Sequence, residues 1–297
     1  MALAVEAVVV VGDDRQAACA EALQRRGWRV RCLGRSAAGL PASPDPGIVA
    51  DADVVLGPVT GFEAGRLAGD LAGPAAEPER WPFRPGALYI GGRPSDALRR
   101  ALAERGARWH DLLQNEAFAE ANALPTAEGA VLRAQQLGRR IIAGQAAAVL
   151  GFGRCGRALA LLLRGMGAAV TVVARRTEQR QEAAARGLKA SPFEDLAGVL
   201  ERSTLVFNTV PAPVLGRELL VRLPREALVV DIASRPGGVD WDAVRELGVE
   251  AHLELALPAR FFPVTAGEIL AETAVRVVAG GCEAASPPAC QETRQES

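Results

Sequence analysis

Histidine and lysine are scarce in this sequence. The chain of 297 residues has two histidines, and its one lysine is Lys189. Its five cysteines are an odd number, lie far apart and form no CxxC pair, which is typical of reduced thiols rather than disulfides. With so few metal-binding side chains, the sequence predicts no metal site.

Long apolar runs and a large charge imbalance are also missing. The net charge is −1, which argues against a nucleic acid or a membrane surface as the main partner. No segment reaches about 18 uninterrupted apolar residues, and the N-terminus shows no basic start or cleavage site, so neither a transmembrane helix nor a signal peptide is predicted. We therefore expect a cytoplasmic protein.

The strongest motif lies between residues 145 and 176. Residues 146–150 form a short apolar run typical of a buried strand, residues 151–156 read G-x-G-x-x-G, and an apolar helix and a second strand at 169–173 follow. This βαβ context predicts a dinucleotide site, in which glycines allow a tight turn, an approach to the pyrophosphate and close helix packing. The alternative is a plain strand–helix turn. The expected cofactor contacts are Gly151, Phe152, Gly153, Arg154, Cys155 and Gly156.

The residues after the second strand indicate whether NAD or NADP is the cofactor. A site for NAD usually carries a carboxylate there, whereas this chain reads Ala174-Arg175-Arg176-Thr177. Guanidinium groups match phosphate oxygens, so NADP is favoured, with NAD as the alternative, unless both arginines are merely solvated. Further cofactor contacts are expected after later strands, at Asn208, Val210, Pro211 and Asp231.

The alternation of strands and helices predicts an α/β protein with two doubly wound parallel-sheet domains, Rossmann- or flavodoxin-like, and a cleft between them. The N-terminal domain, for substrate or partner, is expected to span residues 1–122, and the cofactor domain residues 123–264. We expect a helix at 265–280 to pack back on the first domain and a disordered tail at 281–297. A helix linking the domains is expected to start near Leu124, with Pro125 in its first turn.

Several further motifs occur along the chain. They are Gly12-Asp13-Asp14-Arg15-Gln16, Asn122 with Pro125 to Gly129, the loop Asp231-Ile232-Ala233-Ser234-Arg235-Pro236-Gly237-Gly238, and Pro258 with Thr265-Ala266-Gly267. Together these motifs resemble those of the dipicolinate synthase A-subunit family. The resemblance spans roughly residues 7 to 278. It implies an NAD(P)-dependent oxidoreductase, similar in architecture to 2-hydroxy-acid dehydrogenases, that makes dipicolinate from a dihydrodipicolinate-level precursor. It further implies a flavoprotein-like second subunit, the mother cell of a sporulating bacterium as location, and a homo-oligomer.

The implied substrate is a flat ring with two carboxylates, which calls for cations and hydrogen-bond donors. Arg15 and Arg235 are the best carboxylate partners, although Arg15 is equally suited to an ion pair with Asp13 or Asp14 and Arg235 to solvent. Backbone N–H groups of the Gly-Gly pair and two threonine hydroxyls are expected to complete the site. The predicted substrate contacts are Arg15, Asn122, Thr126, Ser234, Arg235, Gly237, Gly238 and Thr265. Val264 stands where the family often has lysine.

Glu128 and Arg235 are the predicted catalytic residues. Glu128 is the first candidate for the base, although a glutamate in a first helical turn also complements the helix dipole. His110 and His252 fit core or strand-end positions better than catalysis. Two alternative functions stay open: another NADP-dependent dehydrogenase of this architecture, shikimate- or hydroxy-acid-like, and a dinucleotide-binding sensor or scaffold. The lone Lys189 lies inside the cofactor domain, which disfavours a shikimate-type lysine–aspartate pair.

Overall fold

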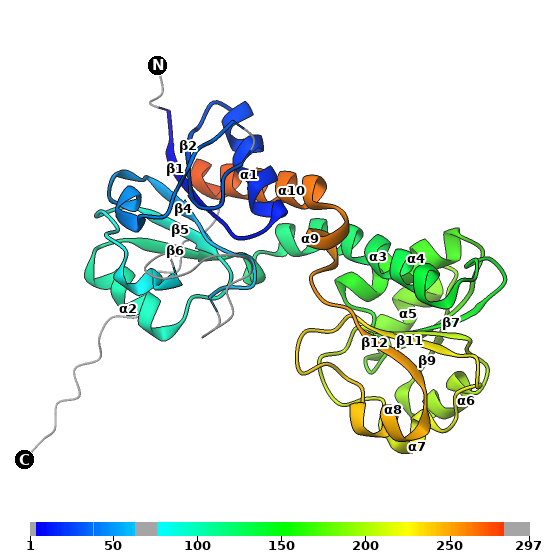
Figure 1. Cartoon of the computed structure of the whole chain (residues 1–297). Coiled ribbons are helices and arrows are strands. Elements are labelled where there is room, and N and C mark those ends of the chain that lie inside the picture. The colour runs from blue at the N-terminus through cyan, green and yellow to red at the C-terminus, as the bar shows by residue number, and fades with distance from the viewer. Residues whose placement is uncertain (1–3, 38, 63–75, 282–297) are drawn as a thin grey trace, which may run out of the picture. The chain divides into compact units, whose positions relative to one another are not determined.

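The chain folds into two compact units (Figure 1). The computed structural model describes residues 4–37, 39–62 and 76–281. Unit 1 comprises residues 1–119 and 263–297, and unit 2 comprises residues 120–262, so the boundaries fall slightly before the predicted positions 122 and 264. The tail expected at 281–297 lies outside the described residues, except for Gly281. No helix among the described residues is long and apolar enough to cross a membrane.

Unit 1 is built on a six-stranded parallel sheet with the order β3-β2-β1-β4-β5-β6. The strands are β1 (Glu6–Val11), β2 (Arg29–Gly34), β3 (Ala42–Ser43), β4 (Val54–Leu56), β5 (Leu88–Gly91) and β6 (Arg108–Asp111). The helices are α1 (Asp14–Arg25), α2 (Asp96–Glu104) and α10 (Pro263–Arg276), with short 3₁₀ turns at Pro46–Asp51, Pro78–Arg80 and Leu112–Gln114. This order is that of a doubly wound sheet, as predicted.

Strand β1 explains why the unit has helices on both faces. Val9 and Val11 join the apolar cluster that contains Leu23 of α1 and Leu270 of α10, whereas Val10 joins the cluster with Trp81 on the other face. A central parallel strand buried on both faces reads as an uninterrupted apolar run rather than an alternating one.

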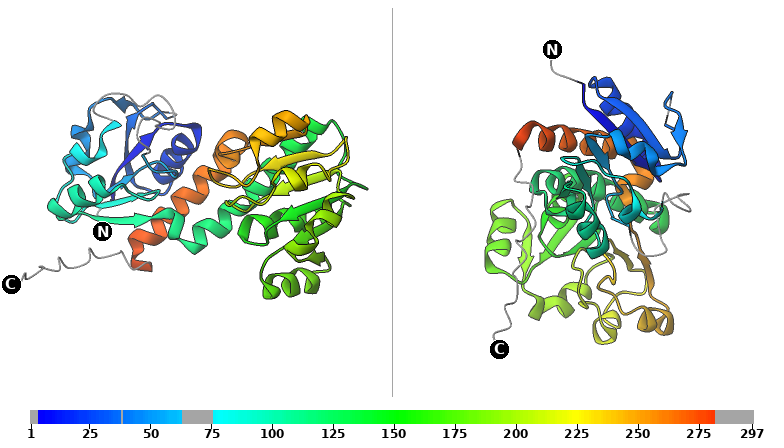
Figure 2. Two further views of the ribbon diagram at one scale, coloured as in Figure 1. Left: turned by 90° about the horizontal axis from the view of Figure 1, so that it is seen from below. Right: turned by 90° about the vertical axis from the view of Figure 1, so that its left-hand side faces the viewer.

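Helix α10 completes one face of unit 1, because it lies along α1 (Figures 1 and 2). A Cβ atom added to Gly267 would lie 2.6 Å from the Cβ of Ala18 and 2.7 Å from both the carbonyl oxygen of Arg15 and the amide nitrogen of Cys19. The two helix backbones therefore approach so closely that only glycine fits at this position. The last helix is held against the first by backbone contact.

Helix α3 (Glu116–Gly138) begins earlier than predicted, and the unit boundary falls within it. Asn115 provides the start that sequence reasoning missed, since its Oδ1 accepts a hydrogen bond of 2.9 Å from the Phe118 amide. Pro125 therefore lies inside the helix rather than in its first turn. The prediction of a helix start near Leu124 is wrong because the start is capped by Asn115 and the helix continues through Pro125, although proline is favoured in a first turn.

Unit 2 also contains a six-stranded parallel sheet, with the order β12-β11-β10-β7-β8-β9. Its strands are β7 (Ala146–Leu150), β8 (Ala169–Val173), β9 (Lys189–Ser191), β10 (Leu205–Asn208), β11 (Leu228–Asp231) and β12 (Glu250–Leu253). Its helices besides α3 are α4 (Arg154–Gly165), α5 (Thr177–Ala185), α6 (Leu196–Leu200), α7 (Arg217–Leu220), α8 (Trp241–Leu247) and α9 (Leu257–Phe261). The short helices α7 and α9 were not predicted.

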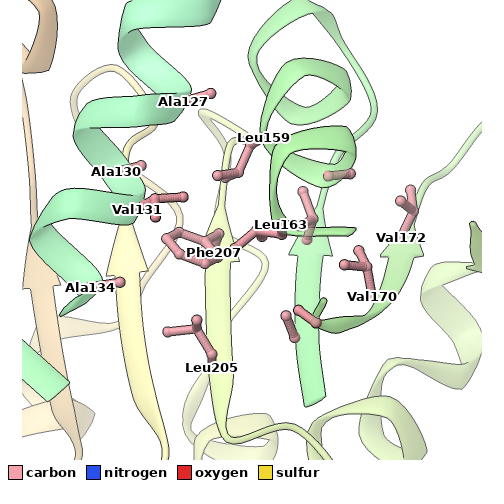
Figure 3. Close-up of a cluster of buried hydrophobic side chains, with 14 of the residues drawn as sticks. Ala127, Ala130, Val131, Ala134, Leu159, Leu163, Val170, Val172, Leu205 and Phe207 are labelled. Carbon is pink, nitrogen blue, oxygen red and sulfur yellow. The ribbon is translucent and has the colours of Figure 1, made fainter. Parts of the chain in front are cut away.

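Two apolar layers cover the sheet of unit 2. On one face, alanines and Val131 of α3 pack with Leu159 and Leu163 of α4 around Phe207 of β10 (Figure 3). On the other face, Leu150 of β7 packs with residues of α6, α7 and α8. The many alanines of α3 let this helix lie close to the sheet. The two-layered cover of both sheets confirms the predicted fold class.

A buried ion-pair network ties α3 to α9 in unit 2. Glu254 follows β12 and is 5% exposed. Its Oε1 accepts a hydrogen bond of 2.8 Å from Nε of Arg133, and its Oε2 accepts one of 2.6 Å from Arg260. Burial alone would raise the pKa of the Glu254 carboxyl, but the two guanidinium groups outweigh it and leave the pKa below its usual range. This carboxylate has a structural task.

Substitution of Gly267 tests the α1–α10 contact. We expect Gly267→Ala to lower the free energy of unfolding of unit 1 by about 1–3 kcal/mol, because the added methyl group overlaps the α1 backbone. Urea unfolding followed by tryptophan fluorescence measures the effect in a Trp241→Phe background, in which the remaining tryptophans, Trp28, Trp81 and Trp109, all lie in unit 1. Val264→Ala, at a position of the same helix that is 61% exposed, is the control and should stay within about 0.5 kcal/mol of the wild type. An unchanged stability for Gly267→Ala would refute the contact.

His110, which contacts Asn115 at the start of α3, makes the free energy of unfolding depend on pH. Its ring is 7% exposed and its Nε2 lies 3.0 Å from Nδ2 of Asn115, a donor, so the ring accepts there and is neutral. Burial lowers the pKa of His110, and Asp111 only partly opposes this. Below the unfolded pKa of about 6.5, the unfolded chain takes up a proton that the folded chain does not, so stability falls as pH falls.

We expect the wild type to lose stability between pH 7 and pH 5 more steeply than His110→Gln. The difference in slope is at most about 1.4 kcal/mol per pH unit, the limit for one proton. Urea titrations of both proteins at several pH values measure it, and the carboxylates they share cancel in the comparison. Parallel pH profiles would show that His110 does not contribute.

Candidate dinucleotide-binding site

The glycine motif forms the turn between β7 and α4 at the point where the strand order reverses. Gly151 has a φ of 94°, a left-handed conformation that favours glycine. A Cβ atom on Gly156 would lie 2.3 Å from the carbonyl oxygen of Gly151, so the helix starts directly against the turn. A Cβ atom on Gly153 would meet no atom within 4 Å, so the space above the loop is open. In open parallel sheets, ligands bind outside the carboxyl ends of the strands at such a switch point.

The N-terminus of α4 offers hydrogen-bond donors to this space. Its N-cap is Gly153, and no side chain caps the helix. The backbone N–H groups of the first turn and the positive end of the helix dipole are therefore available to an anion. Residues 151 to 156 form this turn and helix start, and the uncapped N–H groups suit an anion such as a pyrophosphate.

The thiol of Cys155 is a small packing group in this loop. Burial raises the pKa of the Cys155 thiol, which Arg154 and a hydrogen bond with the Thr126 side chain only partly offset. A neutral thiol is a poor nucleophile. This agrees with the interpretation of Cys155 as a residue tolerated beside the phosphates.

The tip of β8 carries the predicted arginines on its surface. Ala174 is buried, while Arg175, Arg176 and Thr177 are exposed. Arg180 on α5 donates to the carbonyl oxygens of Ala174 at 2.9 Å and of Arg175 at 2.7 Å. The backbone at the strand tip is therefore held by a third arginine that the sequence patterns did not single out.

The ends of β10 and β11 are joined by a buried polar network. Asn208 and Asp231 are both fully buried, and Nδ2 of Asn208 donates to Oδ1 of Asp231 at 2.9 Å. The other carboxylate oxygen accepts from the Gly238 amide at 2.8 Å, and Oδ1 also accepts from the Ala233 amide at 3.0 Å. Both predicted cofactor residues can thus act on a ligand only through the loops they hold.

The loop from Ser234 to Gly238 is folded around Asp231. Ser234 and Arg235 are exposed, so the Arg235 guanidinium is available to an anion. The amide of Gly237 donates to the Ser234 carbonyl at 2.9 Å, and that of Gly238 donates to Asp231. The expectation that these two N–H groups bind a substrate carboxylate is therefore wrong, because the loop itself uses them.

Thr209 is a residue that sequence reasoning missed. Its hydroxyl donates to the carbonyl oxygen of Leu150 at 2.8 Å and would lie 2.5 Å from a Cβ on Gly151. The side chain thus fixes the end of β10 against the glycine turn. Its neighbour Val210, a predicted cofactor contact, also lies at this turn, since its Cγ2 would be 3.0 Å from the same Cβ, and Pro211 is exposed.

Three predicted residues on α3 lie in unit 2. The Thr126 hydroxyl donates to the Asn122 carbonyl oxygen at 2.7 Å, and its side chain contacts Cys155 of the glycine loop. Oδ1 of Asn122 is buried and has no hydrogen-bond partner among the described residues. Glu128 is exposed and lies inside α3, so it is not the first-turn glutamate of the alternative interpretation.

Two predicted substrate residues lie in unit 1. Arg15 is 5% exposed, and its Nη2 is 3.7 Å from Oδ2 of Asp13, which is the ion pair considered from the sequence. Its Nε has no partner among the described residues. Burial lowers the pKa of this guanidinium, while Asp13 and Cys19 oppose the shift. Thr265, in the first turn of α10, is exposed.

A doubly wound sheet with an uncapped glycine turn at its switch point is the architecture of dinucleotide-binding domains. Residues 102–257 match the family described as D-isomer specific 2-hydroxyacid dehydrogenase, NAD binding domain, and the chain belongs to this family. No cluster of three or more metal-binding side chains occurs in the described part of the chain.

This chain resembles the A-subunit of dipicolinate synthase in sequence and in structure. The A-subunit from Bacillus subtilis (strain 168) is 33% identical over 168 residues, so the match covers 57% of this chain and 57% of that protein. The crystal structure of its counterpart from Bacillus halodurans superimposes with a TM-score of 0.80 at 27% identity, covering 93% of this chain and 99% of that one. These matches confirm the resemblance predicted from the sequence motifs.

A transhydrogenase from Sinorhizobium meliloti shares the fold. Its structure has a TM-score of 0.67 at 18% identity and covers 92% of this chain and 93% of that one.

The cradle predicts a specific effect of a methyl group at Gly156. We expect Gly156→Ala to weaken binding of NADP⁺ or NAD⁺ by at least about tenfold, because its Cβ would displace the glycine turn by overpacking that costs about 1–3 kcal/mol. Isothermal titration calorimetry measures the affinity. Gly165→Ala at the end of the same helix meets no atom within 4 Å and is the matched control. Equal affinities in both variants would contradict the cradle.

Proposed function

We propose that this protein is an NADP-linked oxidoreductase that forms dipicolinate from a dihydrodipicolinate-level precursor. The observation that carries the proposal is the structural similarity to the A-subunit of dipicolinate synthase, which extends over nearly the whole of both chains. The dinucleotide cradle in unit 2 supplies the second requirement, a place for a hydride acceptor. The bound cofactor would accept a hydride from the ring as the ring becomes aromatic.

Exposed and buried cations support a substrate with two carboxylates. Arg235 projects from a loop anchored by Asp231, and its fork can bind one carboxylate through two hydrogen bonds. Arg15 carries a buried Nε without a partner among the described residues, at the start of α1, and a bound carboxylate would satisfy it. Each unit thus offers one candidate carboxylate partner, and Asn122, Thr126, Ser234 and Thr265 remain candidate substrate contacts.

A proton must also leave the ring when a hydride is transferred. Glu128 is exposed and forms no ion pair within the described part of the chain, so its carboxylate can accept a proton. We keep it as the candidate base, with Arg235 as the second member of the proposed catalytic set. Aromatic stabilisation of the product reduces the strength of base required. The buried Glu254 is unsuited to this task because two arginines hold it ionised.

The exposed arginines at the tip of β8 favour NADP in this proposal. No carboxylate follows β8 before Glu178, and the first side chains past the strand and Ala174 are those of Arg175 and Arg176. Arginine forks bind a 2′-phosphate better than a ribose diol. We further propose action together with a flavoprotein-like second subunit, as a homo-oligomer in the mother-cell cytoplasm of a sporulating bacterium.

A spectrophotometric assay tests the proposal. Purified protein is mixed with NADP⁺ or NAD⁺ and freshly generated precursor, with and without the second subunit. We expect NADP⁺-dependent growth of the reduced-nicotinamide absorbance band with stoichiometric dipicolinate in the product analysis. Gly156→Ala, impaired in the cradle, should show neither. Tight cofactor binding without turnover, even with the partner, would favour a redox sensor or a different substrate.

A further inference from the structure

The first two turns of α5 hold both loops that face the proposed cofactor. Gln179 donates to the carbonyl oxygen of Phe152 in the glycine loop at 3.2 Å. The next residue, Arg180, donates from Nη1 to the carbonyl oxygens of Ala174 and Arg175 and from Nη2 to the Thr177 hydroxyl at 2.9 Å. Adjacent side chains of one helix thus connect the pyrophosphate loop with the tip of β8.

The contacts of Arg180 change the electrostatics of the strand tip as well as its shape. Carbonyl oxygens carry partial negative charge and would repel a phosphate group placed beside them. A guanidinium shared between two carbonyls and a hydroxyl neutralises these oxygens and fixes the backbone of residues 174–177. Arg175 and Arg176, which project from that backbone, are then presented from a rigid segment.

We propose that Arg180 is a positioning residue that sets the preference for a 2′-phosphorylated dinucleotide. It acts by holding the backbone that carries Arg175 and Arg176, and the planar fork is essential because its two terminal nitrogens reach acceptors at separate positions, which the single nitrogen of a lysine cannot do. A lysine in its place keeps the charge but not this geometry. The inference rests on the NADP part of the proposed function and is independent of the substrate.

Binding of two cofactor fragments tests this role without any turnover. 2′,5′-ADP carries the 2′-phosphate and 5′-AMP lacks it, so the ratio of their affinities isolates the contribution of the phosphate. We expect the wild type to bind 2′,5′-ADP more tightly than 5′-AMP. In Arg180→Gln and Arg180→Lys the affinity for 2′,5′-ADP should fall about tenfold, because Arg175 and Arg176 are no longer held in place to bind the 2′-phosphate, while the affinity for 5′-AMP should change less than about twofold.

Arg186→Gln is the matched control. Arg186 lies at the C-terminal end of α5, is exposed and pairs with Glu182, so the substitution removes the same charge from the same helix without touching the strand tip. Its affinity ratio should equal that of the wild type. Melting temperatures of all variants identify any that fail to fold. If Arg180→Gln fails to fold, Arg180→Lys, the milder change, still tests the inference.

Three results would overturn the inference. They are an affinity ratio that is unchanged in the Arg180 variants, whether or not both affinities fall, a wild-type ratio in Arg180→Lys, and a wild-type protein that binds both fragments equally. The Arg180 variants could lose the preference for 2′,5′-ADP over 5′-AMP while the wild type makes no dipicolinate. That outcome would refute the proposed reaction and leave the role of Arg180 intact.

Discussion

The loops after β10 and β11 of unit 2 depend on the hydrogen bonds to the buried carboxylate of Asp231. It accepts hydrogen bonds from the Asn208 side chain and from two backbone amides, and so fixes the loops after β10 and β11 in one arrangement. A buried charge is tolerated only when its hydrogen-bonding capacity is met. Removing any donor would leave part of it unsatisfied. The position of Arg235, in the loop that follows β11, thus depends on a carboxylate that is fully buried.

Around the glycine turn, too, the residues suited to contact a ligand differ from the residues that hold the backbone in place. Side chains suited to contact a ligand, such as Arg175 and Arg235, are exposed. The side chains that hold their backbone in place are wholly or partly buried and form hydrogen bonds with backbone groups. Thr209 locks the glycine turn, and Arg180 locks the strand tip. Exposed arginines are flexible, so a site that discriminates between anions needs their backbones to be rigid. Rigidity is supplied here by neutral backbone groups more than by ion pairs.

Local patterns in the sequence predicted most of the fold. The glycine motif located the cradle, and apolar runs located the central strands of both sheets, because these features depend on residues close in the chain. The start of α3 was misplaced, because Asn115 is recognisable as a cap only when His110 and Phe118 are seen beside it. The use of the Gly237 and Gly238 amides and the role of Arg180 depend on contacts across loops. Hydrogen bonds between separate loops follow no periodic pattern in the sequence, so they cannot be predicted from it.

The contact of α10 with α1 has a consequence for the order of events during synthesis. Unit 2 is one continuous segment of chain, whereas unit 1 needs residues from both ends of it. While the ribosome is still translating α10, one face of the first sheet lacks its cover and exposes the apolar side chains of α1. The segment made first is therefore the last to be finished, and the cofactor unit can fold ahead of it. During that interval the N-terminal segment is the part of the nascent chain most open to chaperones and proteases.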